Sequence, residues 1–510
     1  MDHWKTASTN GLRVNEGFER CRKFVDGWLQ HADPQTGLIP RNLKDGADIW
    51  NAKDAGADNY PFMVLTAALT DSALFQSVMK KILASEELLT SRVGRLPDTY
   101  QFSKGGFASD SIMLDNIIFG ASEYIKDGLM PLTEWLGKSP WSDRMIGMLD
   151  DIWANAQLET PYGRIPSLNV EVNGELLQVM ARLYWMTGDQ KYLDWSKRLA
   201  NYYLLGSNHP TRDFQSLRLR DHGCEIVSGL CEFYIMLHYA VKDEKHIYQP
   251  QIHEMLDRIL EVGRNSDGLF YDAIDPQTGQ VLIDRVADNF GYNLNGFYSV
   301  YQIDSIHSYR EAALKALSAL DANYRTYAWE GTSADGYADA IEGALNLYNR
   351  EPVASVTDWM DSEIQVMWSK QQDDGIIEGW HGDGNFARTT IMYCLWKTKG
   401  ITLHPWRSDL QLGAVMQNDT IWVTVEADSS WHGHMVMDRS RHREAMHLPH
   451  DWPRINQFPE WFTVPDAPNH DYKLLENRQS TVRTASDLRN GLTIHYEDQP
   501  LKFKIYPILE

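Results

Sequence analysis

A repeated junction constrains this chain more than any other feature of its sequence. Over residues 1 to about 400, a polar or glycine-rich cluster precedes an amphipathic segment, a short turn and a second amphipathic segment. Such junctions recur at intervals of 42 to 71 residues, near Asp58, Asp110, Asn173, His222, Asn293, Asp335 and Asn385. A helical hairpin cannot bury its apolar face alone, so successive hairpins must stack on one another.

Residues 173–202 show the pattern most clearly. The apolar residues of the first segment fall at i, i+3, i+4 and i+7, which is one face of a helix: Leu176, Val179, Met180 and Leu183. Residues 187–189 break this stripe, and a second one follows at Tyr192, Trp195, Leu199 and Tyr202. Return helices are also predicted over residues 355–372, with Thr357 or Asp358 as N-cap, and over residues 250–263, opened by Pro250 and closed by Gly263.

Six or seven hairpins of about 50 residues could form an open solenoid or a closed ring. A solenoid needs polar capping repeats and usually has a tighter period. The uneven intervals and elaborate loops favour the ring, so we predict a mainly α fold, an (α/α)6 toroid over residues 1–402. In such a ring, the loops that enter the inner helices converge at one mouth, where functional residues should lie.

After Gly400 the hydrophobic period changes to two. Ile421, Val423 and Val425 share one face, and residues 492–498 and 501–509 alternate in the same way. This pattern predicts a small C-terminal antiparallel β-sheet or sandwich domain over residues 403–510. The long connection at residues 448–472, rich in proline and aromatic residues, is expected to pack against the toroid. Its apolar side chains could also serve a homodimer contact.

Charge and cysteine content exclude several classes of function. Lys and Arg number 48 against 70 Asp and Glu, a net charge of −22, which argues against nucleic-acid and anionic-membrane partners. No apolar run reaches transmembrane length, and the first residues lack the apolar core of a signal peptide, which leaves the compartment undetermined. The four cysteines lack CxxC spacing, which predicts free, buried thiols.

Carboxyl side chains gather at the predicted mouth. Cleavage of a glycosidic bond needs a proton donor and a second carboxylate that activates water or attacks carbon. For any single residue, capping of a helix is the simpler role. Repetition across junctions favours catalysis, and the candidates are Glu175, Glu225, Asp221 and Asp58. Glu175 and Glu225 lead because each precedes a strongly apolar helix, where desolvation raises the pKa of a carboxyl group.

Other side chains in these junctions could bind a sugar. Arg388 lies beside Trp380 and His381 and could bind a carboxylate bidentately, which would suit a uronic acid, and Arg220 with His222 offers the same chemistry. A salt bridge to a neighbouring carboxylate is the alternative role for Arg388. The remaining predicted binding residues are Asn59, Tyr60, Asn173, Asn289, Tyr292, Asn293, Trp329 and Glu330.

No metal or cofactor is expected. The chain lacks HExxH, GxSxG, GxGxxG and P-loop motifs. His432 and His434 could ligate zinc from one strand face, but they are more simply explained as loop and interface residues of the β domain.

Several stretches resemble known carbohydrate enzymes. Residues 187–204 resemble the hairpin turn found across (α/α)6 enzymes, including the unsaturated uronyl hydrolases. Residues 54–62 (DAGADNYPF), 220–225 (RDHGCE) and 441–464 together resemble glycoside hydrolase family 154, over nearly the whole chain. The resemblance implies an exo-acting β-glucuronidase of plant or gut glycans, with a toroid and a β domain.

The sequence therefore predicts a glycoside hydrolase that removes a terminal β-linked glucuronic acid, with Glu225 or Glu175 as the acid. One alternative is an unsaturated uronyl hydrolase, in which an Asp protonates a vinyl ether. Another is a uronate polysaccharide lyase, for which Tyr292 or His222 would be the base. A sugar epimerase using histidines and a non-catalytic glycan-binding protein also stay open.

Overall fold

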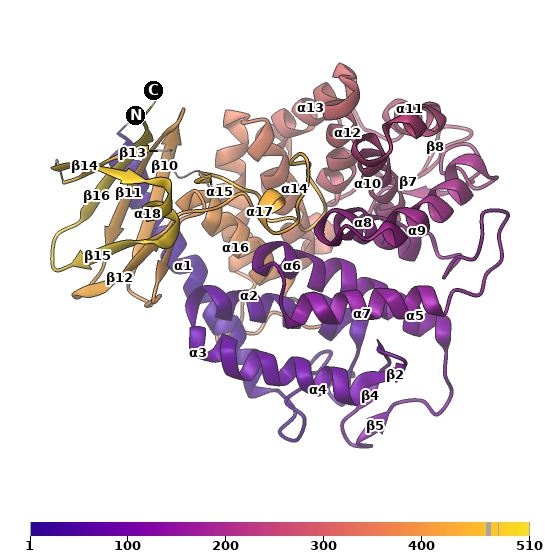
Figure 1. Ribbon diagram of the computed structural model, residues 1–510, viewed down its shortest axis with the longest axis horizontal. Helices are drawn as coiled ribbons and strands as arrows, with labels where there is room; N and C mark the ends of the chain where they lie inside the picture. Colours follow the sequence, from indigo (N-terminus) through magenta and orange to yellow (C-terminus); the bar gives the residue numbers. More distant parts are fainter. Residues whose placement is uncertain (1, 466–470, 478, 509–510) are drawn as a thin grey trace.

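The computed structural model describes residues 2–465, 471–477 and 479–508, without the side chain of His222. The chain runs once around a ring of helices, as the colours of Figure 1 show from violet through magenta to orange, and ends in strands at one side. No helix among the described residues is long and apolar enough to cross a membrane. Cys21, Cys224, Cys231 and Cys394 are free and buried, as predicted.

Within the described residues, seven helical segments form the inner wall of the ring. They are buried almost all round, because one face lines the centre and the other packs against outer helices. The segments are η1–α2 (Ala52–Asn59, Tyr60–Thr70), α5–η3–α6 (Leu114–Glu123, Tyr124–Leu129, Met130–Leu136), α8 (Val170–Thr187), α10 (Glu225–Ala240), α12 (Phe290–Asp304), α14 (Ala334–Arg350) and α16 (Asn385–Thr398).

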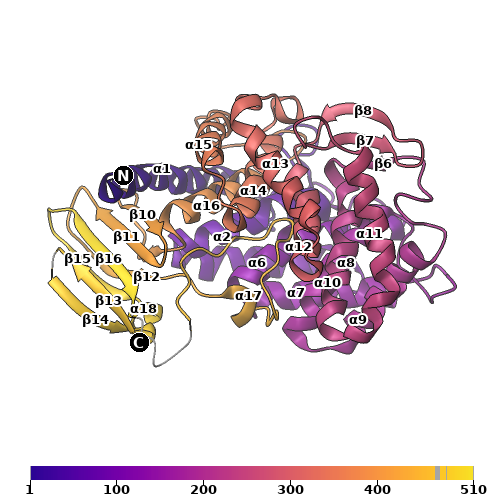
Figure 2. The same cartoon turned by 90° about the horizontal axis from the view of Figure 1, so that it is seen from above.

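Half-buried helices surround this wall (Figure 2). They are α1 (His3–Gln30), α3–η2–α4 (Ser72–Leu74, Phe75–Met79, Lys80–Thr90), α7 (Pro140–Ala154), α9–η4 (Gln190–Ala200, Asn201–Leu205), α11 (Lys245–Val262), α13 (His307–Asn323) and α15 (Ala354–Trp368). Helix α16 packs against α1 and α2, which closes the ring. The predicted toroid of helical hairpins is confirmed. The described residues form seven helical pairs, one more than the six of an (α/α)6 ring and one for each junction in the sequence.

The predicted turn between α8 and α9 is confirmed. Gly188 follows α8 in a left-handed conformation (φ 70°), which glycine adopts without a steric penalty. Asp189 then caps α9 by accepting a hydrogen bond from the backbone N–H of Lys191. The single break in the helical pattern at residues 187–189 was therefore enough to place this hairpin.

Two predicted helix starts were wrong. Helix α15 begins at Ala354, because the chain can enter a helix as soon as it leaves Pro352, so Thr357 and Asp358 lie inside its first turns. Helix α11 begins at Lys245, continuing a short 3-10 turn, and Pro250 lies within it. The predicted end at Gly263 is correct.

The C-terminal strands form two antiparallel sheets, which confirms the predicted β domain. One has the order β10-β11-β16-β13-β14 and the other β15-β12-β9. The strands are β9 (Thr402–His404), β10 (Gln411–Gln417), β11 (Thr420–Glu426), β12 (Trp431–Val436), β13 (Asp471–Glu476), β14 (Gln479–Thr484), β15 (Leu492–Tyr496) and β16 (Leu501–Pro507). Ile421, Val423 and Val425 face the core between the sheets.

Short strands decorate the ring and were not predicted. A hairpin of β7 (Tyr271–Asp275) and β8 (Gln280–Val286) pairs with β6 (Leu217–Arg218) just before α10. On the other side, β1 (Ile49–Trp50) pairs with β4 (Tyr100–Gln101) and β5 (Gly106–Phe107), and β2 (Ser91–Val93) pairs with β3 (Leu96–Pro97). Most of these segments are too short to show period-two alternation in the sequence, and β8, which has seven residues, is largely exposed on both faces.

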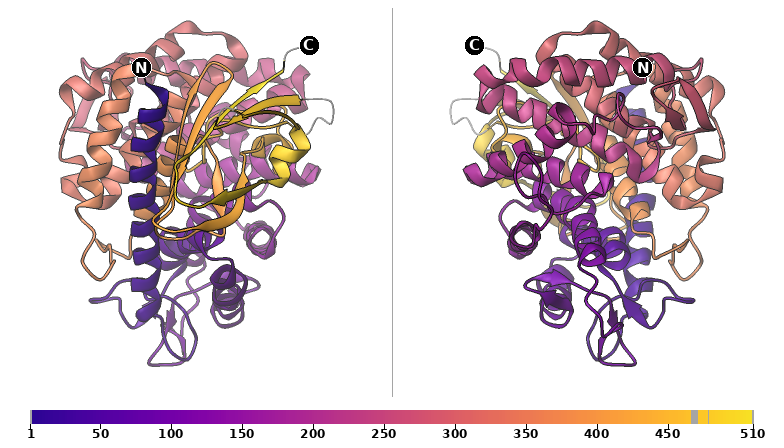
Figure 3. Two further views of the ribbon diagram at one scale, coloured as in Figure 1. Left: turned by 90° about the vertical axis from the view of Figure 1, so that its left-hand side faces the viewer. Right: turned by 90° about the vertical axis from the view of Figure 1, so that its right-hand side faces the viewer.

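The first helix connects the two parts of the molecule. Helix α1 runs alongside β10 and β11 (Figure 3). Asn10 donates a hydrogen bond of 2.9 Å to the carbonyl of Ala414, and the ring of His3 stacks on Trp422. A Cβ atom at Gly413 would lie only 2.0 Å from the carbonyl oxygen of Ala7, so this close approach requires glycine.

The linker between β12 and β13, described over residues 437–465, closes one end of the ring. It contains the short helix α17 (Arg441–Glu444) and contacts the C-terminal halves of the inner helices. Asn346 donates to the carbonyl of Gln457, and Arg454 forms an ion pair of 3.0 Å with Glu134. Trp452, Ile455 and Phe458 are buried here, which leaves these side chains unavailable for the homodimer contact considered above.

Candidate active site at the ring mouth

The N-terminal halves of the inner helices surround a polar pocket, which we call the deep pocket. Its lining comprises Asp58, Glu123, Lys126, Asp127, Asp221, Glu225, Asn289, Tyr292, Asp335, Asp339, His381, Asn385, Arg388 and Asn456. A wider outer pocket shares Asp221, Asp335 and His381 with it and includes Trp380. The deep pocket therefore opens to solvent through the outer pocket, at the ring end opposite the linker.

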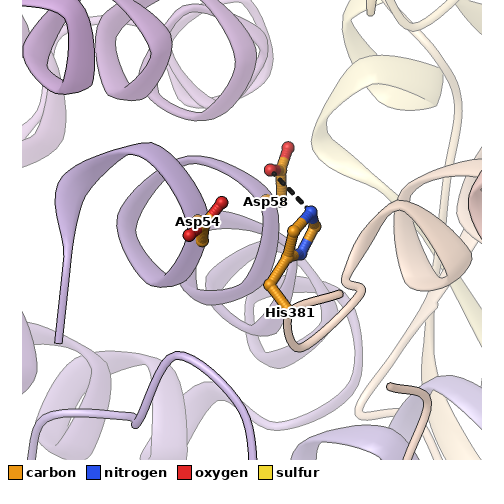
Figure 4. A group of neighbouring side chains, drawn as sticks. All are labelled: Asp54, Asp58 and His381. Atoms are coloured by element: carbon orange, nitrogen blue, oxygen red, sulfur yellow. Dashed lines mark ion pairs between the residues drawn. The ribbon is translucent and has the colours of Figure 1, made fainter. Parts of the chain in front are cut away.

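Asp58 lies in the deep pocket beside His381, which also lines the outer pocket. Asp54 and Asp58 project from η1, and His381 reaches them from the loop before α16 (Figure 4). Asp58 Oδ2 lies 3.5 Å from His381 Nε2, and His381 Nδ1 is 3.0 Å from the carbonyl oxygen of Gly382, which fixes the ring. Asp54 is held by Arg41 at 2.6 Å.

The pKa of Asp58 is raised to about 7. Burial is the largest cause, and the nearby carboxylates of Asp127, Asp54 and Asp383 raise it further, while His381 opposes them. The pKa of His381 is itself raised, because the surrounding carboxylates outweigh its burial. A carboxyl group with a pKa near neutrality can both donate and accept a proton at neutral pH, which is the property of a general acid or base.

Arg388 is held entirely by protein groups. Its side chain is buried and forms ion pairs with Asp339 at 2.7 Å and Glu342 at 2.8 Å. Tyr292 and Asn289 also donate hydrogen bonds to Asp339, at 2.6 and 2.7 Å. The structure thus shows the salt-bridge alternative for Arg388.

Arg220 is engaged in the same way. It lies 3.3 Å from Asp288 and forms a close ion pair with Glu330. Burial raises the pKa of Asp288 to about 7, against the opposing effect of Arg220. Neither of the two arginines predicted to bind a uronate carboxylate therefore lacks an acidic partner in the protein.

The two leading catalytic candidates lie side by side but differ in their partners. Glu225 accepts from Lys126 at 2.6 Å through Oε1 and from Gln178 through Oε2. Glu175 is 1% exposed, and neither of its carboxyl oxygens has a hydrogen-bond partner. Burial, followed by repulsion from Glu171 and Asp127, raises the pKa of Glu175 well above its usual value.

Several predicted binding residues face away from the pocket. Trp329 is fully buried between Tyr324, Phe290 and Trp359, so it belongs to the aromatic core. Tyr60 donates to the carbonyl of Met79 and accepts from Trp141, both on the outer layer.

The predicted asparagines have separate environments. Asn173 donates to Ser167 and Tyr203, and Asn293 donates to the carbonyl of Leu219, so both hold backbone and side chains together. Asn59 is buried with no partner for its amide group. His222 has no described side chain and lies outside this account.

At the rim, Trp380 and Asp221 are accessible. Trp380 is 75% exposed, and the guanidinium of Arg41 lies 5.1 Å from its ring centroid. Asp221 has a left-handed backbone (φ 55°), which is strained for a non-glycine residue, and it lines both pockets. Glu330, which pairs with Arg220, lines the outer pocket with a φ of 44°.

Four pocket residues lie away from the junctions, and the sequence analysis did not find them. Glu123, Lys126 and Asp127 lie in the third and fourth turns of the inner helix that begins at Leu114, away from the junctions. They do leave a signal, since charged residues at i, i+3 and i+4 interrupt an otherwise apolar run. The fourth, Asn456, comes from the linker and donates to Asp127 at 2.7 Å.

Comparisons with known proteins give only remote similarity. No protein-family model matches the sequence, and no curated protein matches it. Among solved structures, the chain is similar to an inactive variant of a family 76 α-1,6-mannanase from Salegentibacter sp. HEL1_6 in complex with α-1,6-mannotetrose, at 11% identity and a TM-score of 0.42 over 74% of this chain and 97% of that one.

Two further solved structures are similar to this chain at comparable sequence identity and TM-score. A family 76 glycoside hydrolase (mannosidase) from Bacteroides thetaiotaomicron is 13% identical, with a TM-score of 0.40 over 75% of this chain and 99% of that one. A possible family 105 member from Salmonella enterica serovar Paratyphi A is 12% identical, with a TM-score of 0.40 over 55% of this chain and 81% of that one. These similarities are too low to indicate an activity.

Proposed function

We propose that the protein is a glycoside hydrolase in which Asp58 acts as the general acid. The observation that carries the proposal is a carboxyl group with a pKa of about 7, placed beside a histidine in a deep pocket lined by further carboxylates. Hydrolysis of a glycosidic bond needs this combination, because one carboxyl must be protonated while another is ionised. The exposed Trp380 at the opening offers a flat apolar face on which a sugar ring can stack.

Asp221 is the second carboxylate in this proposal. It precedes α10, which stands across the ring from η1, so it faces Asp58 over the pocket. Its strained backbone is the kind of local cost that persists at functional sites. Glu225 is less suited, because Lys126 and Gln178 occupy both of its oxygens.

The charges of the pocket favour an uncharged sugar over glucuronic acid. Arg388 and Arg220 already form ion pairs with protein carboxylates, and carboxyl groups outnumber basic groups along the lining. A uronate would therefore add negative charge to an acidic site. The lyase alternative with Tyr292 as base is also disfavoured, because burial raises the pKa of Tyr292 well above its usual value.

Release of 4-nitrophenol from matched β-glycosides tests the proposal. We expect turnover of the β-glucoside or β-galactoside to exceed that of the β-glucuronide. Activity should fall as pH rises above about 7, since the acid must carry its proton. Turnover of the β-glucuronide alone would instead support glucuronic acid, the substrate predicted from the sequence. Activity confined to an unsaturated disaccharide, with loss of ultraviolet absorbance, would instead identify an unsaturated uronyl hydrolase.

Asp58→Asn tests the role of the acid. We expect kcat to fall by roughly 10²–10⁴-fold, because a positioned proton donor is removed while the side-chain shape is kept. Asp110→Asn is the matched control, since Asp110 is exposed beside a junction and outside both pockets. Equal activity of the two variants would contradict the assignment. Rescue of Asp221→Ala by azide, which can replace a missing carboxylate, would support the role of Asp221.

A further inference from the structure

Three carboxyl groups converge on one wall of the deep pocket. Glu123 and Asp127 lie one turn apart in the continuous helix α5–η3, and Glu175 lies in the second turn of α8. One oxygen atom of each group lies within 4.8 Å of the other two. Ionised carboxylates this close repel one another strongly, so the group requires either protons or a cation.

Glu175 is the member that points to a cation. It is 1% exposed, and neither carboxyl oxygen has a hydrogen-bond partner, although its carboxyl group is directed at Glu123 and Asp127. Buried polar groups are normally hydrogen-bonded, and buried charges are paired or bound to metals. A carboxyl directed at two other carboxyls and at no donor therefore leaves a coordination position to fill.

Lys126 carries positive charge at this wall. Lys126 is buried and pairs with Asp127 at 2.7 Å and with Glu225 at 2.6 Å. The carboxyl groups of Glu123, Asp127, Glu171, Glu175 and Glu225 lie around it. In the neighbouring group of Asp54, Asp58 and His381, Arg41 and His381 contribute positive charge.

We propose that Glu123, Asp127 and Glu175 bind one divalent cation, and that Ca²⁺ fits best. All the candidate ligands are carboxylate oxygens, which hard cations prefer, whereas zinc sites usually include nitrogen or sulfur. Ca²⁺–oxygen distances of about 2.3–2.6 Å place ligands on opposite sides of the ion up to roughly 5 Å apart, which accommodates the observed spacing.

Asp127 is already oriented for this role. Lys126 and Asn456 both donate to its Oδ1, at 2.7 Å each, and such outer partners normally hold a ligating carboxylate in place. The site goes beyond the proposed hydrolase function and does not depend on it, because binding can be measured on the resting protein without any sugar.

Isothermal titration of CaCl₂ into the full chain, after removal of metals with EDTA, tests the site. We expect one ion per chain, with a dissociation constant of ~10⁻⁵ M or lower. The melting temperature should rise with Ca²⁺ concentration, because the ion binds the folded state. Absence of both signals in the wild-type protein would overturn the proposal, and would leave the glycosidase assay unaffected as a separate test.

Variants locate the ion. Glu175→Gln keeps the shape of the side chain and should weaken Ca²⁺ binding at least tenfold, and Asp127→Asn should do the same if the first variant does not fold. Glu363→Gln is the matched control, because Glu363 is also a buried glutamate with one unpartnered oxygen but lies on the outer helix α15. Equal affinity for Ca²⁺ in wild type, Glu175→Gln and Asp127→Asn would place any ion elsewhere and overturn the assignment.

Discussion

The carboxyl groups on opposite walls of the deep pocket differ in their hydrogen-bond and ion-pair partners. On the wall formed by α12, α14 and α16, Asp339 receives an ion pair from Arg388 and hydrogen bonds from Tyr292 and Asn289. On the wall formed by α5 and α8, Glu175 has no hydrogen-bond partner and lies against other acids. The carboxyl group of Asp339 on the first wall therefore has partners within the protein, whereas we propose that Glu175 on the second wall binds a cation from solution.

Replacing Arg388 should lower stability more than any other change, because it removes the positive charge that pairs with Asp339 and Glu342 on the first wall. Arg388→Met leaves Asp339 and Glu342 buried without their counter-ion, which should lower the free energy of unfolding by about 3–5 kcal/mol. Urea denaturation measures the change.

Arg164→Met is the control for this comparison. Arg164 forms an ion pair of similar length with Glu159, but both side chains are mostly exposed. Pairs of this kind contribute about 0–1 kcal/mol. If the two variants lost equal stability, the buried ion pairs of Arg388 would stabilise the protein no more than an exposed ion pair does.

Asn456→Ala separates the two walls, because Asn456 contacts both. Its amide donates to Asp127, and its backbone N–H donates to Glu342 at 2.5 Å. Loss of the side chain leaves Asp127 short of a donor and should destabilise the protein by about 1–3 kcal/mol, measured by thermal unfolding. Asn418→Ala is the control. Asn418 has a left-handed backbone conformation, as Asn456 does, but its side chain is exposed in a turn between strands. A similar loss in both variants would indicate backbone strain alone.

Glu175→Gln should give the smallest effect, which depends on pH. The pKa of Glu175 is raised by burial and by repulsion from Glu171 and Asp127, so the folded protein holds this proton more tightly than the unfolded chain. Without metal, its contribution to stability is full below about pH 4.5 and falls as pH rises toward the raised pKa. The variant should be more stable than wild type by about 1 kcal/mol at pH 8, measured by denaturation in EDTA. An unchanged pH profile would mean that Glu175 is not the strained carboxyl.

The arrangement of helices could be predicted because its signals are local. Each polar junction lies at or close to the start of an inner helix, as at Asn385, the first residue of α16, and Asp335, the second residue of α14. The hydrophobic period and the residue types at the turns were sufficient to predict the arrangement of helices. The starts of α11 and α15 were misplaced because a polar residue near a helix start need not be its cap.

The site was only partly accessible from the sequence. Asp58, Asp221 and Glu225 line the deep pocket because junctions converge at one end of a ring. The partners of Arg388 and Arg220 could not be foreseen, since each ion pair joins segments that are far apart in the chain. The catalytic roles stay predictions.

Because of the linker, the ring is closed at one end and is not an open tube. Because residues 451–458 block the far end of the ring, a polymer cannot thread through it, and whatever enters the pocket leaves by the same opening. Only the end of a chain, or a protruding branch, can reach Asp58. Removing the strand domain together with its linker would expose Arg182, Glu134 and Glu232 to water at this end of the ring.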